Sequence, residues 1–129
     1  LKVDYVGGEK WSLGRFDFIQ LKQLFNTWQS GMQAGGGWNA LFWSNHDQPR
    51  ALSRFGDDKN YPYQSATMLA TALHCMRGTP YIYQGEEIGM TNPQFSNLED
   101  YRDVESINAY NLMGSEWGYS HTQAMEILA

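Results

Sequence analysis

Three consecutive polar residues, Asn45, His46 and Asp47, follow the apolar run 41–43 within the segment LFWSNHDQPR. A carboxylate can accept hydrogen bonds from two adjacent hydroxyl groups, and an imidazole can donate or accept one more. The same carboxylate would also stabilise positive charge that develops on a sugar ring. These residue types therefore suit a polyol site. The alternative is an ordinary turn, in which Asp47 caps the turn before Pro49 and His46 is a core residue whose ring nitrogens are hydrogen-bonded.

Charged residues nearby extend the set of candidates. Arg50 could hold Asp47, or a substrate carboxylate or phosphate, through a bidentate fork. A structural ion pair with a nearby acid is the alternative, and we favour it for Arg54. Glu86 and Glu87 could be a catalytic carboxylate pair, but adjacent side chains diverge. We therefore expect this acidic pair to tether a loop through an ion pair.

The histidines and the single cysteine offer no metal site and no cofactor site. His46, His74 and His121 are scattered, with no paired Cys or His at ligand spacing. Cys75 lies in the apolar helical run 68–76, which favours a buried structural thiol over a reactive one. A lone cysteine excludes an internal disulfide and is compatible with a reducing, cytoplasmic compartment.

Composition limits the class of protein. The chain has 129 residues, of which 42% are hydrophobic and 15% aromatic, enough for the packed core of one domain at most. Fourteen acidic residues against 9 basic ones give a net charge of −5, which argues against nucleic-acid binding. No run approaches the roughly 18 apolar residues of a membrane span, and no signal peptide is visible.

Alternating helices and strands must position the polar residues. Asp17 is a suitable N-cap for a helix that must stop at the glycine block 35–37. The nearly all-apolar run 38–43 is typical of a strand that is covered on both faces. A polar loop follows, and its Pro62 argues against helix there. Near the other end, Asp103 suits the N-terminus of a further helix, and the segment SHTQAMEILA is amphipathic.

The second half of this pattern repeats the order of helix and strand. Ser65 is expected to cap a helix that runs to about Arg77 and stops at Gly78. Its predicted buried stripe comprises Met68, Leu69, Ala72, Leu73 and Met76. Residues 79–83 form a second short strand, in which Pro80 fits only at the first positions. A strand–helix–strand connection of this length implies parallel strands, so the polar clusters 45–50 and 84–87 both lie at carboxyl ends of strands.

Three motifs carry a family resemblance. LFWSNHDQPRALSRFGDD, then GTPYIYQGEEIGMTNPQF, then DYRDVES, in this order, resemble the α-amylase-type glycoside hydrolase superfamily, closest to its trehalose-6-phosphate hydrolase and oligo-1,6-glucosidase branch. The resemblance extends from Leu1 to about Met113 and is weakest over 114–129. It implies an α/β fold, a fragment of a (β/α)₈ TIM barrel in which NHD ends the seventh strand and TPYIYQGEE is the eighth. Residues 1–129 would form the C-terminal portion of that catalytic domain, truncated at both ends.

The resemblance also assigns roles to residues. Asp47 would be the third catalytic carboxylate, which stabilises an oxocarbenium-like transition state, and His46 would grip the same sugar hydroxyls. The nucleophilic Asp and the acid/base Glu of the family are absent from this chain. A retaining glycosidase needs two such carboxyl groups about 5 Å apart, so we expect the fragment to be inactive alone.

The opening segment LKVDYVGGEKW resembles trehalose-6-phosphate hydrolases more than oligo-1,6-glucosidases. Lys2 and Lys10 bracket a glycine-containing loop, and two ammonium groups there could bind a 6-phosphate. The alternative for Lys10 is a solvated loop charge. A sucrose isomerase is less favoured, because residues 2–5 lack the extra arginines of that branch.

Two functions of different class remain. The chain is either part of an α-glucosidase that acts on a small sugar or sugar phosphate, or an independent, non-catalytic sugar-binding module. Two parallel strands alone would leave open edges and an uncovered apolar face. We therefore expect the chain to self-associate through those edges or to belong to a larger molecule.

Overall fold

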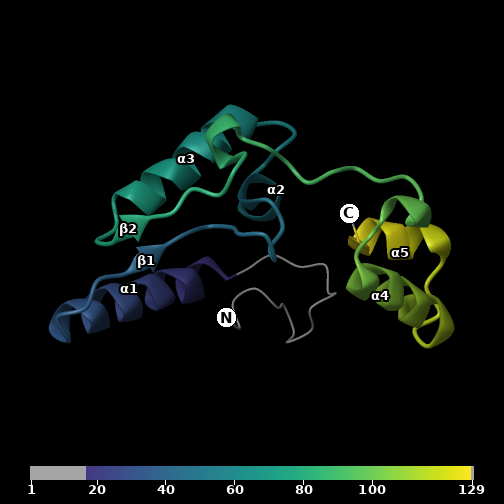
Figure 1. Ribbon diagram of the computed structural model, residues 1–129, viewed down its shortest axis with the longest axis horizontal. Helices are drawn as coiled ribbons and strands as arrows, with labels where there is room; N and C mark the ends of the chain where they lie inside the picture. The colour runs from purple at the N-terminus through teal and green to yellow at the C-terminus, as the bar shows by residue number, and fades with distance from the viewer. Residues whose placement is uncertain (1–16, 129) are drawn as a thin grey trace. The chain divides into compact units, whose positions relative to one another are not determined.

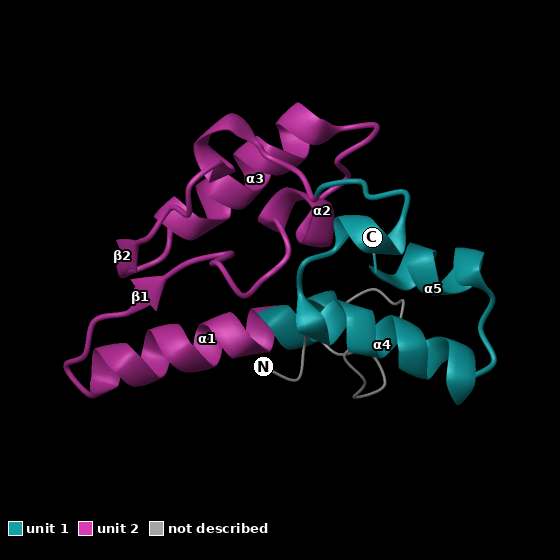
Figure 2. Ribbon diagram, turned by 45° about the vertical axis from the view of Figure 1, so that its right-hand side comes forward, with its two compact units in different colours: residues 1–21, 93–129 teal, residues 22–92 magenta. Residues whose placement is uncertain are grey.

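The structure is a computed structural model that describes residues 17–128. Lys2 and Lys10 lie outside the described residues. The chain divides into two compact units, one of residues 22–92 and one of residues 1–21 with 93–129 (Figure 2). The polar segments that the sequence singled out at 45–50 and 84–87 both lie in the unit 22–92.

The unit 22–92 contains a strand–helix–strand arrangement. In chain order it comprises α1 (Phe18–Ala34, which begins in the other unit), β1 (Ala40–Leu41), α2 (Ala51–Phe55), α3 (Pro62–His74), β2 (Thr79–Pro80) and the 3-10 helix η3 (Glu86–Ile88) (Figure 1). β1 and β2 are parallel, with Ala40 opposite Thr79 and Leu41 opposite Pro80. The predicted parallel pairing is therefore confirmed.

Helix α1 begins and ends where the sequence predicts. The Asp17 carboxylate accepts hydrogen bonds from the backbone N–H groups of Ile19, at 2.8 Å, and Gln20, at 3.4 Å. These bonds satisfy donors that have no partner inside the first turn of a helix. After Ala34, Gly36 adopts a φ of 69°, which a residue with a side chain rarely adopts, and the helix stops.

The two strands are shorter and more exposed than predicted. Thr79 N–H donates to the Asn39 carbonyl at 2.8 Å and Tyr81 N–H donates to the Leu41 carbonyl at 2.7 Å. Pro80 lies between these two donors, where its missing N–H costs nothing. The expectation of a strand covered on both faces is wrong for the described residues, because Trp38 is 58% and Phe42 is 52% exposed.

Helix α3 begins four residues and ends about three residues before its predicted bounds. It begins at Pro62 rather than after Ser65, because proline at the first helical position gives up only an N–H that has no helical partner. The Ser65 hydroxyl instead accepts from the Asp57 N–H at 2.9 Å. The helix ends at His74, so Gly78 is not its cap. A Cβ on Gly78 would lie 2.7 Å from the Asn39 carbonyl oxygen, so this glycine permits the close approach of the strands.

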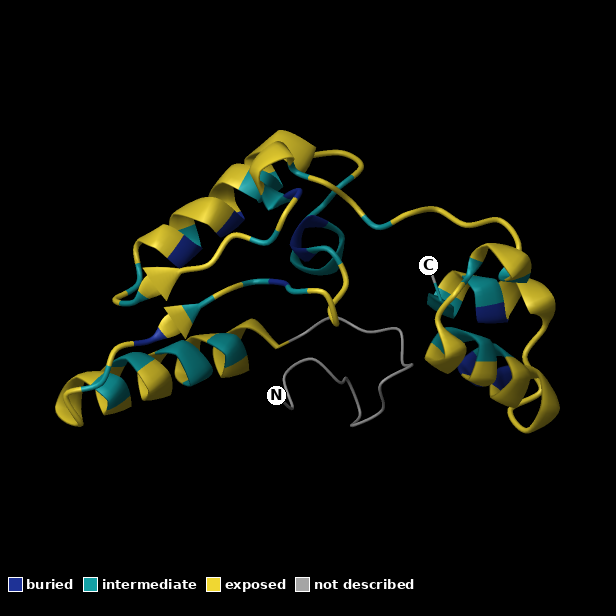
Figure 3. Cartoon of the chain, in the orientation of Figure 1, coloured by how far each residue is buried: buried dark blue, intermediate teal, exposed yellow. Residues whose placement is uncertain are grey.

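The exposure of residues in α2, in α3 and directly after α3 differs from several predictions (Figure 3). Leu69 and Leu73 are the buried residues of α3, whereas Met68 is 51% exposed. Cys75 follows the end of α3 and is exposed, so the prediction of a buried thiol is wrong. The loop predicted after the first strand contains α2, whose Ala51 and Leu52 are among the most buried residues of the chain.

The second unit has its own small core. It contains the 3-10 helix η4 (Leu98–Asp100), α4 (Val104–Ser115) and α5 (His121–Leu128). Asp103 caps α4 as predicted, accepting from the backbone N–H groups of the residues two and three positions later. The core consists of Ala109, Met113 and Ala124. Within residues 17–128, every helix is too short or too polar to span a bilayer.

Candidate active site

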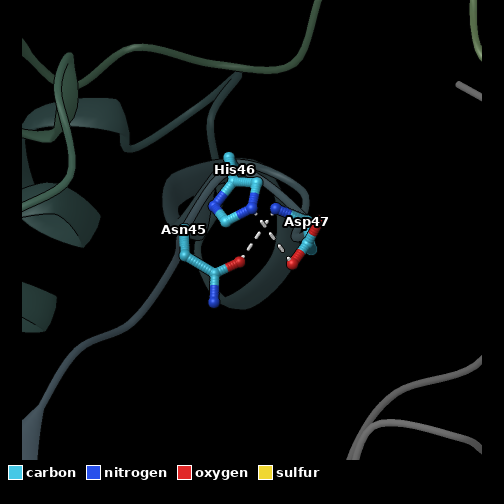
Figure 4. A network of polar contacts seen from close by, with 3 residues as sticks. All are labelled: Asn45, His46 and Asp47. Carbon is cyan, nitrogen blue, oxygen red and sulfur yellow. Dashed lines mark hydrogen bonds and ion pairs between the residues drawn. The ribbon is translucent and has the colours of Figure 1, made fainter.

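Residues 45–48 form a hydrogen-bonded turn after β1, and Figure 4 shows its first three residues, Asn45, His46 and Asp47. The Asn45 side-chain oxygen accepts from the Asp47 N–H at 2.9 Å, and the Asn45 carbonyl accepts from the Gln48 N–H at 3.2 Å. Asn is well suited to this role because its side chain bonds the backbone two residues on. The backbone therefore forms a turn, as the alternative predicted, but the side chain that caps it belongs to Asn45 and not to Asp47.

His46 and Asp47 project from this turn together. The His46 Nε2 lies 3.4 Å from the Asp47 Oδ2, and the two side chains are 77% and 72% exposed. The alternative in which His46 is a core residue is therefore wrong. An imidazole and a carboxylate held side by side, both accessible, can together contact adjacent hydroxyl groups of one ligand.

Trp43 anchors the base of the turn. Its ring packs against Phe25 of α1 at 5.7 Å and Phe55 of α2 at 5.4 Å between centroids. Its indole N–H donates to the Leu69 carbonyl of α3 at 2.8 Å. Trp43, which ends the apolar run, thus contacts three helices through its side chain. The preceding aromatic residue, Phe42, is 52% exposed.

An apolar hollow of about 330 Å³ adjoins the turn. Its lining comes from both strand segments and comprises Ala40, Phe42, Ser44, Asn45, Tyr81, Ile82 and Tyr83. Ligand sites for small molecules combine such aromatic walls with a few polar groups at one end. The polar lining residues of the hollow are Ser44 and Asn45, and His46 and Asp47 follow them in the turn.

Arg50 and Arg54 bind other parts of the protein. The Arg50 guanidinium donates to the Gln84 carbonyl and lies over the Tyr83 ring, 5.1 Å from its centroid. Arg50 therefore reaches the segment after β2, and its predicted contact with a substrate stays a prediction. The Arg54 guanidinium donates to the Gln48 side-chain oxygen.

The two adjacent glutamates diverge, as expected. Glu86 accepts a hydrogen bond from the Ser44 hydroxyl, and Glu87 accepts one from the Gly85 N–H at 2.7 Å. Among the described residues, the loop tether that the sequence predicted as an ion pair is thus the hydrogen bond between Ser44 and Glu86, since the Glu87 bond stays within its own segment. Sequence reasoning missed Ser44, which is only 2% exposed. A small hydroxyl residue between an apolar run and a turn was the available signal.

The part of the chain that the structure describes holds no group of three or more histidine, cysteine or acidic side chains arranged for a metal ion.

The chain is similar to known proteins over nearly its whole length. A family model described as the catalytic domain of alpha amylase matches residues 1–121. The trehalose-6-phosphate hydrolase of Bacillus subtilis (strain 168) is 67% identical over 111 residues, which cover 86% of this chain and 20% of that protein. The oligo-1,6-glucosidase of Parageobacillus thermoglucosidasius is 51% identical over 126 residues, 98% of this chain and 22% of that protein.

A solved structure agrees with these sequences. The crystal structure of Bacillus licheniformis trehalose-6-phosphate hydrolase superposes with a TM-score of 0.93 at 58% identity, covering 98% of this chain and 23% of that one. The chain thus spans about a fifth of the length of the curated relatives it matches.

Proposed function

The chain belongs to the α-amylase catalytic-domain family, and from this premise we propose that it is part of a retaining α-glucosidase that hydrolyses trehalose 6-phosphate to glucose and glucose 6-phosphate. We call the protein that would contain it the parent enzyme. The structural relatives are TIM-barrel enzymes of the same family. The observation that carries the proposal is the exposed His46–Asp47 pair on a turn after a parallel strand. Carboxyl ends of parallel strands are where such barrels hold their active sites.

Within the parent enzyme, residues 1–129 would form the C-terminal portion of the catalytic barrel. The parallel pair β1 and β2 would be its seventh and eighth strands. Two paired residues in each strand cannot close a sheet. This supports a larger barrel around the chain, with self-association through the open edges as the outcome expected for the isolated chain.

We assign Asp47 to transition-state stabilisation. As glycosidic bond cleavage proceeds, positive charge develops at the ring carbon and oxygen of the sugar. A carboxylate fixed beside that ring lowers the energy of the charged state more than that of the neutral substrate. His46, 3.4 Å from Asp47, would bind the hydroxyls of the same ring. Arg50, Lys2 and Lys10 complete the predicted substrate-binding set.

The nucleophile and the acid/base of the reaction would come from parts of the parent enzyme outside this chain. Retaining cleavage needs two carboxyl groups about 5 Å apart, one to attack the sugar and one to protonate the leaving oxygen. Asp47 fills neither role in this proposal, so the 129-residue chain alone would be inactive.

Identity favours a phosphorylated disaccharide as the substrate. The chain is 67% identical to a trehalose-6-phosphate hydrolase and 51% identical to an oligo-1,6-glucosidase. Lys2 and Lys10 would bind the 6-phosphate. Hydrolysis of α-1,6-linked oligosaccharides is the second candidate, because the oligo-1,6-glucosidase match covers 98% of the chain. A non-catalytic sugar-binding module is the alternative of another class.

The exchange Asp47→Asn in the parent enzyme tests the catalytic assignment. Because Asp47 is 72% exposed, the exchange should leave the fold intact and lower kcat by about 100- to 1,000-fold. Asp17→Asn is the matched control, since Asn caps a helix as well as Asp does, and it should leave kcat unchanged. An Asp47→Asn enzyme of normal activity would refute the assignment.

Comparison of substrates tests the specificity. We expect kcat/KM to be higher for trehalose 6-phosphate than for isomaltose, and Lys2→Ala and Lys10→Ala to raise KM for trehalose 6-phosphate while leaving unphosphorylated trehalose unaffected. A preference for isomaltose would favour the oligo-1,6-glucosidase function. Micromolar binding of trehalose 6-phosphate to the isolated chain, measured by calorimetry, would favour the independent module.

A further inference from the structure

We propose that Glu86 is a positioning residue for Asp47 and that it acts through the buried hydroxyl group of Ser44. The inference rests on the proposed function, because it assigns Glu86 a task in the same site. Glu86 itself does not belong to the turn that carries His46 and Asp47. It lies in η3, on the segment that follows β2.

Ser44 is the fixed point from which the turn begins. It is 2% exposed and directly precedes Asn45, whose side chain and carbonyl both close the turn. A buried hydroxyl without a hydrogen-bond partner is unfavourable, so the position of Ser44 depends on its acceptor. Glu86 is that acceptor. A hydroxyl that donates to a carboxylate makes a stronger bond than one that donates to a neutral group.

A second tie holds the turn from its other end. The Arg50 guanidinium donates to the Gln84 carbonyl, and the Arg50 N–H donates to the Asn92 side-chain oxygen at 2.8 Å. Asn92 N–H in turn donates to the Ser53 hydroxyl at 2.9 Å. The segment after β2 therefore forms hydrogen bonds with the chain on both sides of the turn, at Ser44 and at Arg50.

Gly85 allows the segment after β2 to approach this closely. Its φ of 94° favours glycine, and a Cβ there would lie 3.0 Å from the Arg50 Nη1. The same residue immediately precedes Glu86, so the bend that admits the arginine also sets the direction of the glutamate. Two adjacent features of the sequence, Gly85 and Glu86, thus serve one geometric purpose.

Such a tie is expected to affect the turnover rate. Both side chains of the His46–Asp47 pair are largely exposed, so their own packing does not fix them. Catalytic groups must be held close to their productive position, because a displacement of about 1 Å can cost about a hundredfold in rate. Release of Ser44 would let the root of the turn move, and Asp47 would move with it.

The test uses the parent enzyme with trehalose 6-phosphate as the substrate. Glu86→Ala and Ser44→Ala each remove the hydrogen bond, from opposite sides, and should lower kcat by about 10- to 100-fold with a smaller change in KM. Glu86→Gln keeps an acceptor oxygen and should restore kcat to within a few fold of the wild-type value. Glu99→Ala and Glu99→Gln are the controls, since Glu99 is an exposed glutamate of η4 in the other compact unit. They should leave kcat nearly unchanged.

A double-mutant cycle separates positioning from general destabilisation. In an Asp47→Asn background, Glu86→Ala should lower the residual kcat by less than about twofold, because no carboxylate is left to position. An equal loss of kcat in both backgrounds would overturn the proposal. So would wild-type kcat in Glu86→Ala and Ser44→Ala. If Glu86→Ala does not fold, Ser44→Ala carries the cycle. Normal kcat in Asp47→Asn alone would instead refute the proposed function.

Discussion

The strongest structural prediction concerns Trp43, which ties α1, α2 and α3 together beneath the candidate site. Two exchanges separate its contributions. Trp43→Phe keeps an aromatic ring against Phe25 and Phe55 but removes the N–H that donates to the Leu69 carbonyl. Trp43→Ala removes the ring as well.

The structure sets the expected magnitudes. The lost hydrogen bond in Trp43→Phe should cost about 1 kcal/mol, at the middle of the usual range, because a carbonyl inside a helix already accepts one backbone N–H. Trp43→Ala should cost about 3 kcal/mol, the lower end for a buried tryptophan, since Trp43 is only partly buried. At about 1.4 kcal/mol for each factor of ten, these free energies correspond to changes in the opening equilibrium constant of about fivefold and more than a hundredfold.

Amide hydrogen exchange of the purified protein measures these effects locally. We expect protection of the α3 amides to fall by about fivefold in Trp43→Phe and by more than a hundredfold in Trp43→Ala. Protection in α1 should fall in parallel. Helices α4 and α5 belong to the other compact unit and should keep their exchange rates.

Trp28→Phe is the matched control, since Trp28 lies on α1 and is 54% exposed. This exchange should change the free energy of local opening, measured at the α1 and α3 amides, by less than about 0.5 kcal/mol. The reasoning fails if Trp43→Phe and Trp28→Phe have equal effects, or if Trp43→Ala leaves the protection of α3 within a factor of two of the wild-type value.

Two further predictions concern other positions. Gly78→Ala should destabilise the protein by about 1–3 kcal/mol in urea unfolding, because the new Cβ would lie 2.7 Å from the Asn39 carbonyl oxygen. Gly31→Ala is the control and should stabilise the protein slightly, since a Cβ there has no neighbour within 4 Å. A Gly78→Ala protein more stable than Gly31→Ala would contradict this reasoning. Hydrogen bonds from the backbone and side chain of Asn60 lower the pKa of Asp57 below its ordinary value of 3.8. The ionised Asp57 carboxylate therefore stabilises the folded protein above about pH 4, and this stabilisation is lost as the pH falls further. In Asp57→Asn, the urea midpoint should consequently fall less steeply with pH below about pH 4 than in the wild type.

Local signals in the sequence predicted most of the helices. Asp17 and Asp103 cap helices because a carboxylate satisfies N–H groups within three residues, a requirement independent of the rest of the fold. The same logic should have placed Pro62 at a helix start, since proline is favoured at the first helical position as well as excluded from the interior. The three family motifs were also sufficient to identify the family, which the comparisons confirm.

Burial could not be predicted from the local pattern. Trp38, Phe42 and Met68 have core-like residue types but are exposed by half or more, because exposure depends on which segments cover a face. Cys75 is exposed for the same reason. The sequence supplies an apolar face, and only the surrounding chain decides whether that face is covered.

The candidate site shows the same division. By itself, the sequence determined that amide, imidazole and carboxylate follow an apolar run, and it offered a turn capped by Asp47 as one interpretation. It could not determine that His46 and Asp47 both project into solvent, or that Ser44 and Arg50 are gripped by residues some 34 to 42 positions later. Those contacts form because parallel pairing of β1 with β2 brings both carboxyl ends to one edge, and such long-range contacts exist only in the folded chain.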